Sequence, residues 1–233
     1  MKIYLLFFTL IFSIATIAQD LTYEEWQLAA ESNIRLQPKY GNAQKTNAQI
    51  EADIAFIEKT MSAFDTRKEA SDEFIRIGYK YLYDNDFKTA MYRFNQAYLL
   101  DPNNANIYLG YGTIYMLYKQ YELSKQQYIE GLEMDPENAR LYVDYGNTYL
   151  VEYYFQPDEM KNVALLDSAI VLLSKSYAIN PNNFHSSMKL SGAFMMKGDC
   201  EQALNYYMIA EAIKGGDFAK ELRIQIENEC LNK

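Results

Sequence analysis

The chain has 233 residues, of which 49% are hydrophobic, and this is enough apolar material for a continuous core. Its formal net charge is −9, with 31 acidic and 22 basic side chains. Because it is acidic and has no basic cluster, we expect no nucleic acid and no anionic membrane surface among its partners.

The N-terminus predicts a secretory signal peptide over residues 1–19. Lys2 precedes an apolar run over residues 3–18, and small side chains come before Gln19 and Asp20. We expect cleavage near Ala18-Gln19-Asp20, a periplasmic or secreted protein, and no membrane insertion afterwards. An uncleaved anchor is the alternative, although the run is short for a membrane span. No cysteine follows the cleavage region, so a lipoprotein anchor is not indicated.

Residues 20–70 predict an N-terminal helical cap. Thr22 with Glu25, and Thr66 with Glu69, have the spacing of capping boxes and predict two helix starts. A loop is predicted around Pro38. Between that loop and Thr66, apolar residues recur at three- to four-residue steps and predict an amphipathic helix from Asn47, with Ile50, Ile54, Ile57, Met61 and Phe64 along its apolar face.

Three glycines, Gly78, Gly112 and Gly146, lie 34 residues apart. Other positions keep the same interval, namely Phe74, Tyr108 and Tyr142; Tyr81, Tyr115 and Tyr149; Ala90 and Ser124; Phe94 and Tyr128; Ala97 and Gly131; and Pro102 and Pro136. A fixed period of this length indicates one supersecondary unit stacked on copies of itself.

The side-chain pattern within each unit predicts two helices. The large residues around Gly78 lie on one helical face, and the glycine lets a neighbouring helix approach closely. A second helix alternates small and large residues on its buried face and ends at Asp101-Pro102, because the residue before proline is pushed out of the helical region.

This pattern resembles the tetratricopeptide repeat over about residues 71–216. The resemblance implies an all-α, right-handed helical solenoid with about four repeats, whose concave side binds peptides or protein partners. It implies a non-enzymatic scaffold for protein–protein contact. The predicted repeats are residues 71–104, 105–138, 139–183 and 184–216, and residues 217–233 are expected to form a capping helix.

The third repeat is longer than the others. Pro136 and Pro181 are 45 residues apart, and the 11 additional residues fall within the segment 150–168. We expect both helices of this hairpin to be lengthened and to project past their neighbours. Tyr153, Tyr154 and Phe155 in this segment have no packing role in the repeat. They suggest an alternative contact surface, for glycan, cell wall or protein.

The two cysteines, Cys200 and Cys230, are candidates for a disulfide, because an oxidising compartment favours pairing. Stacking of the terminal helix as a fifth first helix would bring them together. Two unrelated buried thiols are the alternative.

Catalytic, cofactor and metal motifs are missing from the sequence. The single histidine, His185, stands at the start of a repeat helix, and the sequence has no glycine-rich phosphate loop and no Cys-x-x-Cys pair. We therefore expect no cofactor, no metal site and no enzymatic activity, with an unrecognised catalytic type as the least favoured alternative.

The resemblance also assigns groove residues to the first helix of each repeat. A carboxylate clamp is not expected, because Ile75, Tyr79 and Gly110 occupy clamp positions. Burial of several groove positions is the alternative to partner contact, and the sequence sets no oligomeric state. The assigned positions are Ile75, Arg76, Tyr79 and Tyr83; Leu109, Thr113, Met116 and Leu117; Arg140, Val143, Asp144 and Asn147; and His185, Met188, Lys189 and Met195.

Overall fold

The fold is seen in a computed structural model that describes residues 21–214 and 220–231. These residues form helices and no strand, which confirms the predicted all-α class. The predicted signal peptide and its cleavage site lie outside the described residues.

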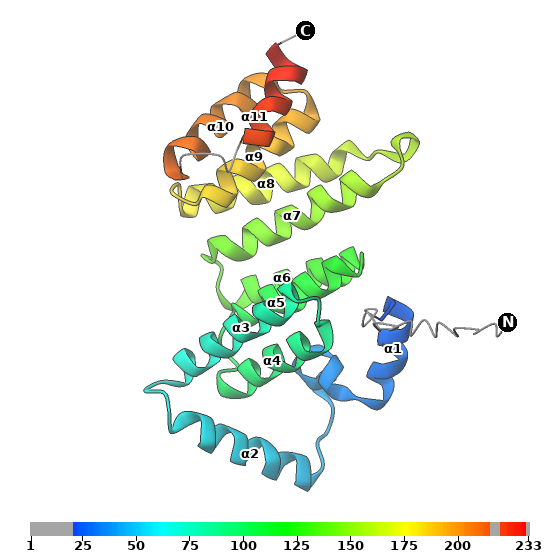
Figure 1. Cartoon of the computed structure of the whole chain (residues 1–233), viewed down its shortest axis with the longest axis vertical. Helices are drawn as coiled ribbons and strands as arrows, with labels where there is room; N and C mark the ends of the chain where they lie inside the picture. The colour runs from blue at the N-terminus through cyan, green and yellow to red at the C-terminus, as the bar shows by residue number, and fades with distance from the viewer. Residues whose placement is uncertain (1–20, 215–219, 232–233) are drawn as a thin grey trace, which may run out of the picture.

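Over the described residues, four helix pairs stack along the long axis of the molecule (Figure 1). In each pair the two helices pack on one another, and each pair contacts the next. We call the first members inner helices and the second members outer helices. The inner helices are α3 (Arg67–Tyr83), α5 (Ile107–Leu117), α7 (Ala139–Phe155) and α9 (Phe184–Lys197), and the outer helices are α4 (Phe87–Leu100), α6 (Tyr121–Met134), α8 (Val163–Ile179) and α10 (Cys200–Lys214).

Glycine–aromatic contacts set the distance between these helices. The fully buried ring of Phe94 lies against Gly78 of α3 and Gly110 of α5, where a Cβ atom would come within 2.5 Å of the ring. The ring of Tyr128 lies in the same way against Gly112. Such distances leave no room for a side chain, so glycine is required where the ring must pack directly on the backbone.

The third pair is longer than the others. Helices α7 and α8 have 17 residues each, so α8 is longer than the other outer helices. Helix α7 only equals α3, so the prediction that both helices are lengthened holds for α8 alone against the first pair. A short 3₁₀ turn, Asp158–Met160, joins them at the tip, which extends beyond the neighbouring pairs in Figure 1. Lys161 closes the end of α7 by donating to the carbonyl oxygens of Tyr153 and Tyr154 at 2.9 and 3.0 Å.

The N-terminal part begins with the predicted capping boxes. Thr22 opens α1 (Tyr23–Ser32), and Thr66 opens α3, each by reciprocal bonding with a glutamate three residues later. Two short turns follow α1, at Ile34–Leu36 and Pro38–Asn42, and lead to α2 (Asn47–Met61).

Residues 22–45, which we call the N-terminal strap, pack on the outer side of the first two pairs. Trp26 and Leu36 are 2% exposed. The side-chain amide of buried Asn95 donates to the carbonyl oxygens of Arg35 and Gln37, both at 2.9 Å. The hydroxyl of Tyr111 donates to the other end of this amide at 2.8 Å. Helix α2, in contrast, buries none of its side chains and lies at the N-terminal end of the stack (Figure 1).

The C-terminal helix α11 (Lys220–Ile226) continues into a π-helical turn, Glu227–Leu231. Ile226 is 1% exposed and packs on Ala203 and Tyr207 of α10. Cys200 and Cys230 form a disulfide with their Cα atoms 5.4 Å apart, which joins the start of α10 to the end of the cap.

The close approach of the Phe94 ring to Gly110 predicts that replacing this glycine destabilises the protein more than replacing a glycine with open space around it. Gly110→Ala should lower the free energy of unfolding by about 1–3 kcal/mol, because the added methyl group would overlap the buried Phe94 ring. Gly192→Ala is the matched control, since it is also helical and has nothing within 4 Å of the added Cβ. It should be neutral or stabilising by up to about 1 kcal/mol. Urea unfolding of the two variants measures the difference, and equal effects would contradict the packing account.

Candidate functional site

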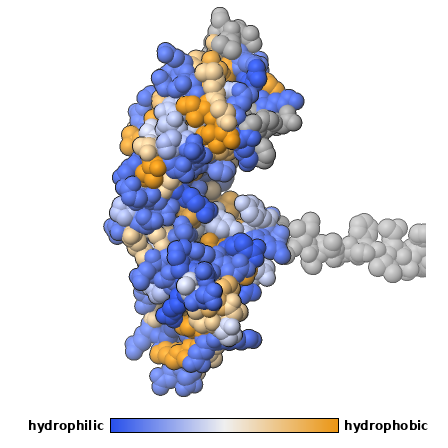
Figure 2. All heavy atoms as spheres, turned by 90° about the vertical axis from the view of Figure 1, so that its left-hand side faces the viewer, coloured by the Kyte–Doolittle hydropathy of each residue, from blue (hydrophilic) through white to orange (hydrophobic). Residues whose placement is uncertain are grey.

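The inner helices line a concave surface, and its outline is indented about midway along the molecule in Figure 2. A hollow of about 340 Å³ lies on this surface, between α3 and the starts of α5 and α7. Its lining includes one residue from each of three consecutive repeats, 34 positions apart: Asp72, Asn106 and Arg140. Equivalent positions in stacked repeats therefore meet at one site.

A chain of polar contacts continues from the second repeat to the fourth. The Lys189 ammonium donates to the Asn147 amide oxygen. The Asn147 amide nitrogen lies 3.5 Å from the Met116 sulfur. Thr113, one turn before Met116, directs its hydroxyl to the carbonyl oxygen of Leu109 at 2.7 Å. These contacts connect three inner helices along the floor of the concave surface.

Two charges at the centre of this surface are partly desolvated. Asp144 keeps some accessible area, yet protein surrounds it on most sides, and this burial raises the pKa of its carboxyl to about 6 against the attraction of Lys189 and Arg140. Burial lowers the pKa of the Lys189 ammonium, and the Asp144 carboxylate opposes that shift. Neither charge is well solvated, although the Lys189 ammonium is partly compensated by its hydrogen bond to Asn147.

Tyr79 joins the apolar core to the concave surface. Its ring packs edge-to-face on Phe94 with centroids 5.5 Å apart. Its hydroxyl is buried and has no partner with hydrogen-bond geometry among the described residues. Burial, and then the Asp144 carboxylate, raises the pKa of Tyr79 well above its ordinary range, so the phenol is protonated.

The structure brings most of the sequence-assigned residues together. Ile75, Arg76 and Tyr79 line the hollow with Arg140. The polar contacts and charges described above join five more of them, which we call the central cluster: Thr113, Met116, Asp144, Asn147 and Lys189.

Other assigned residues need correction. Leu109 and Val143 are 0% and 4% exposed, because their register directs them between helices and into the core rather than to the open face. Ile75 is only 6% exposed, so it can offer little contact area. Met195 packs on the cluster around Ala203 beneath the C-terminal cap.

The ends of two inner helices lie apart from the central cluster. Tyr83 at the end of α3 is 84% exposed, and Leu117 at the end of α5 is 46% exposed. Sequence reasoning missed Asp72 and Asn106, although the 34-residue interval counted back from Arg140 would have found both.

The single histidine, His185, has no carboxylate among the charged groups that act on it. His185 is exposed, and partial burial together with Lys189, Lys214 and Arg140 lowers the pKa of its imidazole. The charged neighbours that act on it are thus basic, and none is a carboxylate that could orient it. Within residues 21–214 and 220–231, no three His, Cys, Asp or Glu side chains are grouped as metal ligands. None of the described helices is both long enough and apolar enough to cross a bilayer.

The raised pKa of Asp144 gives a titration prediction. In the unfolded chain an aspartate has a pKa of about 3.9, so the folded state holds this proton more tightly. The stability contributed by Asp144 should therefore fall as the pH rises from about 4 to about 6. Carboxyl ¹³C NMR, assigned with Asp144→Asn, should give a midpoint near 6, and Lys189→Met should move it higher. A midpoint near 4, or no response to Lys189→Met, would contradict the burial of this pair.

Comparisons with known proteins agree with this architecture. The family model described as tetratricopeptide repeat matches residues 81–142. No curated protein matches the chain in sequence. Among solved structures, the chain is similar to TTC0263, a thermophilic TPR protein of Thermus thermophilus, with 14% identity, a TM-score of 0.58, and coverage of 70% of this chain and 82% of that one.

A second similar structure is that of the MamA protein, with 21% identity, a TM-score of 0.50, and coverage of 68% of this chain and 80% of that one. At these identities the likeness establishes the fold. The matched family model shows tetratricopeptide repeats over residues 81–142, and the structural similarity shows that the chain has the fold of these repeat proteins.

Proposed function

We propose that this protein is a non-enzymatic scaffold that binds a segment of a partner protein on its concave surface. One observation carries the proposal, namely that half-buried side chains of mixed polarity from all four inner helices line up on one open face. These residues are Tyr79, Met116, Asn147 and Lys189. Stacked repeats offer such a surface for extended partners.

The chemistry of the surface suits a segment with both apolar and polar side chains. Met116 and Met188 are half-exposed and adapt their shape to different partners. Asp144 and Lys189 are partly desolvated, so they would select for a segment that offers hydrogen-bonding or charged groups between its apolar ones. An entirely apolar segment would leave these two charges without solvent and would bind less well.

The projecting hairpin tip is the second candidate surface. Tyr154 and Phe155 are 68% and 57% exposed, and Met160 and Val163 beside them are 69% and 50% exposed. The two rings meet edge-to-face at 88°, so they form no single flat platform for a sugar ring. This geometry favours a protein contact over a glycan contact at the tip.

We further propose that the protein is exported to the periplasm or beyond the cell after removal of residues 1–19. The sequence pattern of residues 2–20 supports this. The Cys200–Cys230 disulfide supports it independently, because such bonds persist in oxidising compartments.

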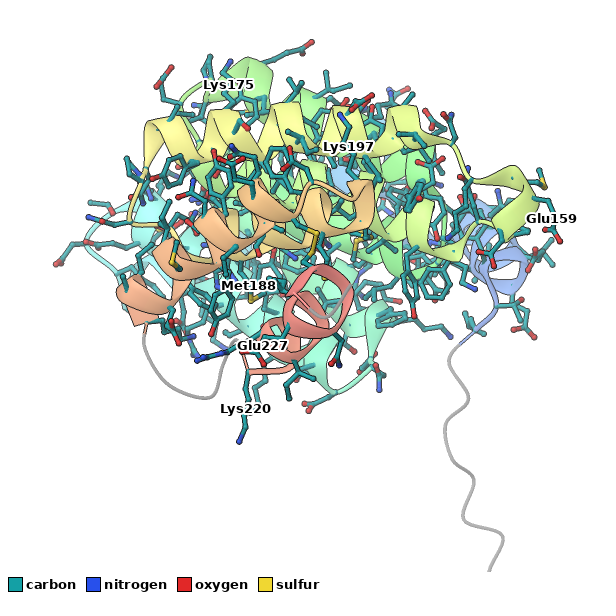
Figure 3. The ribbon with its side chains drawn as sticks, turned by 90° about the horizontal axis from the view of Figure 1, so that it is seen from above. Glu159, Lys175, Met188, Lys197, Lys220 and Glu227 are labelled. Atoms are coloured by element: carbon teal, nitrogen blue, oxygen red, sulfur yellow. A yellow bond between two sulfur atoms is a disulfide. The ribbon has the colours of Figure 1, made fainter. Side chains whose placement is uncertain are left out.

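Site-specific photo-crosslinking tests the binding surface. A photoreactive phenylalanine analogue at Arg140, which is exposed at the hollow, should give discrete partner adducts in the native envelope. The same probe at Lys175 is the control, because Lys175 is exposed on outer helix α8 and lies on the side away from Met188 in Figure 3.

Adding Met116→Glu to the Arg140 probe should abolish the adducts, since a new carboxylate would be placed on the apolar part of the floor. Adducts that form equally from Lys175, or that survive Met116→Glu, would reject the groove as the binding surface. Adducts from Tyr154 alone would favour the hairpin tip.

Intact mass spectrometry of protein purified from its native host tests export. The mass should correspond to a chain that starts near Gln19 or Asp20, and reduction should add two hydrogen atoms. Retention of residues 1–18, or two free thiols in the native protein, would contradict the proposal.

A further inference from the structure

A second hollow lies away from the concave surface, between the N-terminal strap, α2 and α4. It has a volume of about 260 Å³, comparable to roughly nine waters at ~30 Å³ each. Its walls include the apolar side chains of Phe56 and Leu99 and the polar side chains of Arg35, Tyr40, Lys45 and Asp53. The hollow is therefore large enough for a small organic molecule, and its walls offer both apolar and polar contacts.

The hollow exists because α2 does not close on the body of the protein. This helix buries none of its side chains. It is attached by the edge-to-face pair of Phe56 and Phe74, with ring centroids 5.3 Å apart, and by the ion pair of Asp53 with Lys45. Helix α2 lies below α3 and α4 in Figure 1, and its loose packing leaves apolar wall area uncovered.

An unusual backbone places Tyr40 in this wall. Lys39, Tyr40, Gly41 and Asn42 have φ values of 54°, 57°, 63° and 52°, so four consecutive residues are left-handed. This conformation costs roughly 1–2 kcal/mol for each non-glycine residue, and such strain is often kept at functional sites. The turn is held by an ion pair of Lys39 with Glu130 and by the Lys39 amide, which donates to the Tyr111 hydroxyl at 3.2 Å.

The consequence is a largely buried tyrosine whose hydroxyl makes no hydrogen bond to a described residue. Tyr40 is 8% exposed, and its ring lies 3.6 Å beneath the Lys45 ammonium. The side chain forms part of the wall of the hollow. The hydroxyl oxygen itself keeps accessible surface, so it can donate to an acceptor that a ligand supplies in the hollow.

Among the described residues, the charges around the hollow leave the Arg35 cation unbalanced. Lys45 is paired with Asp53. Arg35 stacks its guanidinium 4.0 Å over the Tyr92 ring and makes no side-chain hydrogen bond to a described residue. Arg35 is exposed, and its positive charge acts on the Tyr40 hydroxyl less strongly than the Asp53 carboxylate does, so both charged groups lie near this donor. The hollow thus offers an oriented guanidinium and a phenol next to an apolar wall.

We propose that this hollow is a binding site for a small amphipathic carboxylate. The carboxylate accepts hydrogen bonds from the Arg35 guanidinium and the Tyr40 hydroxyl, and the aliphatic or aromatic body packs on Phe56 and Leu99. Arg35 repels a cationic head group. A neutral head group can still bond with the Tyr40 hydroxyl, but it lacks the charge attraction to Arg35. The site is independent of the groove, because the strap and α2 build it and no groove residue lines it.

Titration calorimetry with sodium octanoate tests the site on the whole protein. Saturable binding with a Kd below about 1 mM is expected, and octan-1-ol and octylammonium should bind at least about tenfold more weakly. Arg35→Gln should weaken octanoate binding about tenfold, because it removes the charge-assisted bond. Tyr40→Phe keeps the ring beneath Lys45, so the strap stays folded, and should weaken binding severalfold.

Arg223→Gln is the matched control, because Arg223 is an exposed arginine on α11, paired with Glu227, that lines neither this hollow nor the groove, and it should leave octanoate binding unchanged. No saturable binding by the unaltered protein up to about 10 mM would overturn the proposal. Equal binding by Arg35→Gln, or octylammonium binding as tightly as octanoate, would overturn the assigned carboxylate contact.

Discussion

The packing of one aromatic ring on the glycine backbone of two inner helices is the constraint on which this structure depends. Phe94 lies fully buried between Gly78 and Gly110, and Tyr128 repeats the contact at Gly112. In the third pair, Leu173 packs on Gly146 where the earlier pairs have an aromatic ring. In the fourth, Ser191 replaces the glycine and donates to the carbonyl oxygen of Ala203 at 2.6 Å. Because interiors are close-packed, these contacts fix how near adjacent helices come and allow each pair to stack only on its neighbours.

An open concave surface follows from that stacking. Equivalent positions of successive inner helices meet along one face, so Asp72, Asn106 and Arg140 line one hollow although 34 residues separate each from the next. The centre of this face holds a pair of opposite charges, Asp144 and Lys189, that the fold desolvates without burying completely. Such a pair contributes little to stability, since the cost of desolvation offsets much of the attraction. Its position on an open face agrees with the role in selecting a partner that we propose for it.

The repeats could be predicted from the sequence because each one packs small and large side chains at the same positions of its two helices. The 34-residue spacing of Gly78 and Gly112 identified the inner helices, and capping-box spacing found the starts at Thr22 and Thr66. The groove assignment was less accurate. Leu109 and Val143 occupy the same repeat position as Ile75, and all three are buried, because this position packs against a neighbouring helix rather than facing the groove. The hollow at Tyr40 could not be predicted, because a left-handed turn at non-glycine residues has no sequence signature and is held by distant partners such as Glu130 and Tyr111.

The central claim is that the face formed by the inner helices holds the partner. Hydrogen–deuterium exchange of the complex with a partner recovered by crosslinking tests this claim most directly, because it reports protection along the whole backbone without altering a residue. The account predicts slower exchange in the segments of α3, α5, α7 and α9 that border the groove, with the outer helices unchanged. Protection confined to the outer helices, the strap or the hairpin tip would contradict it.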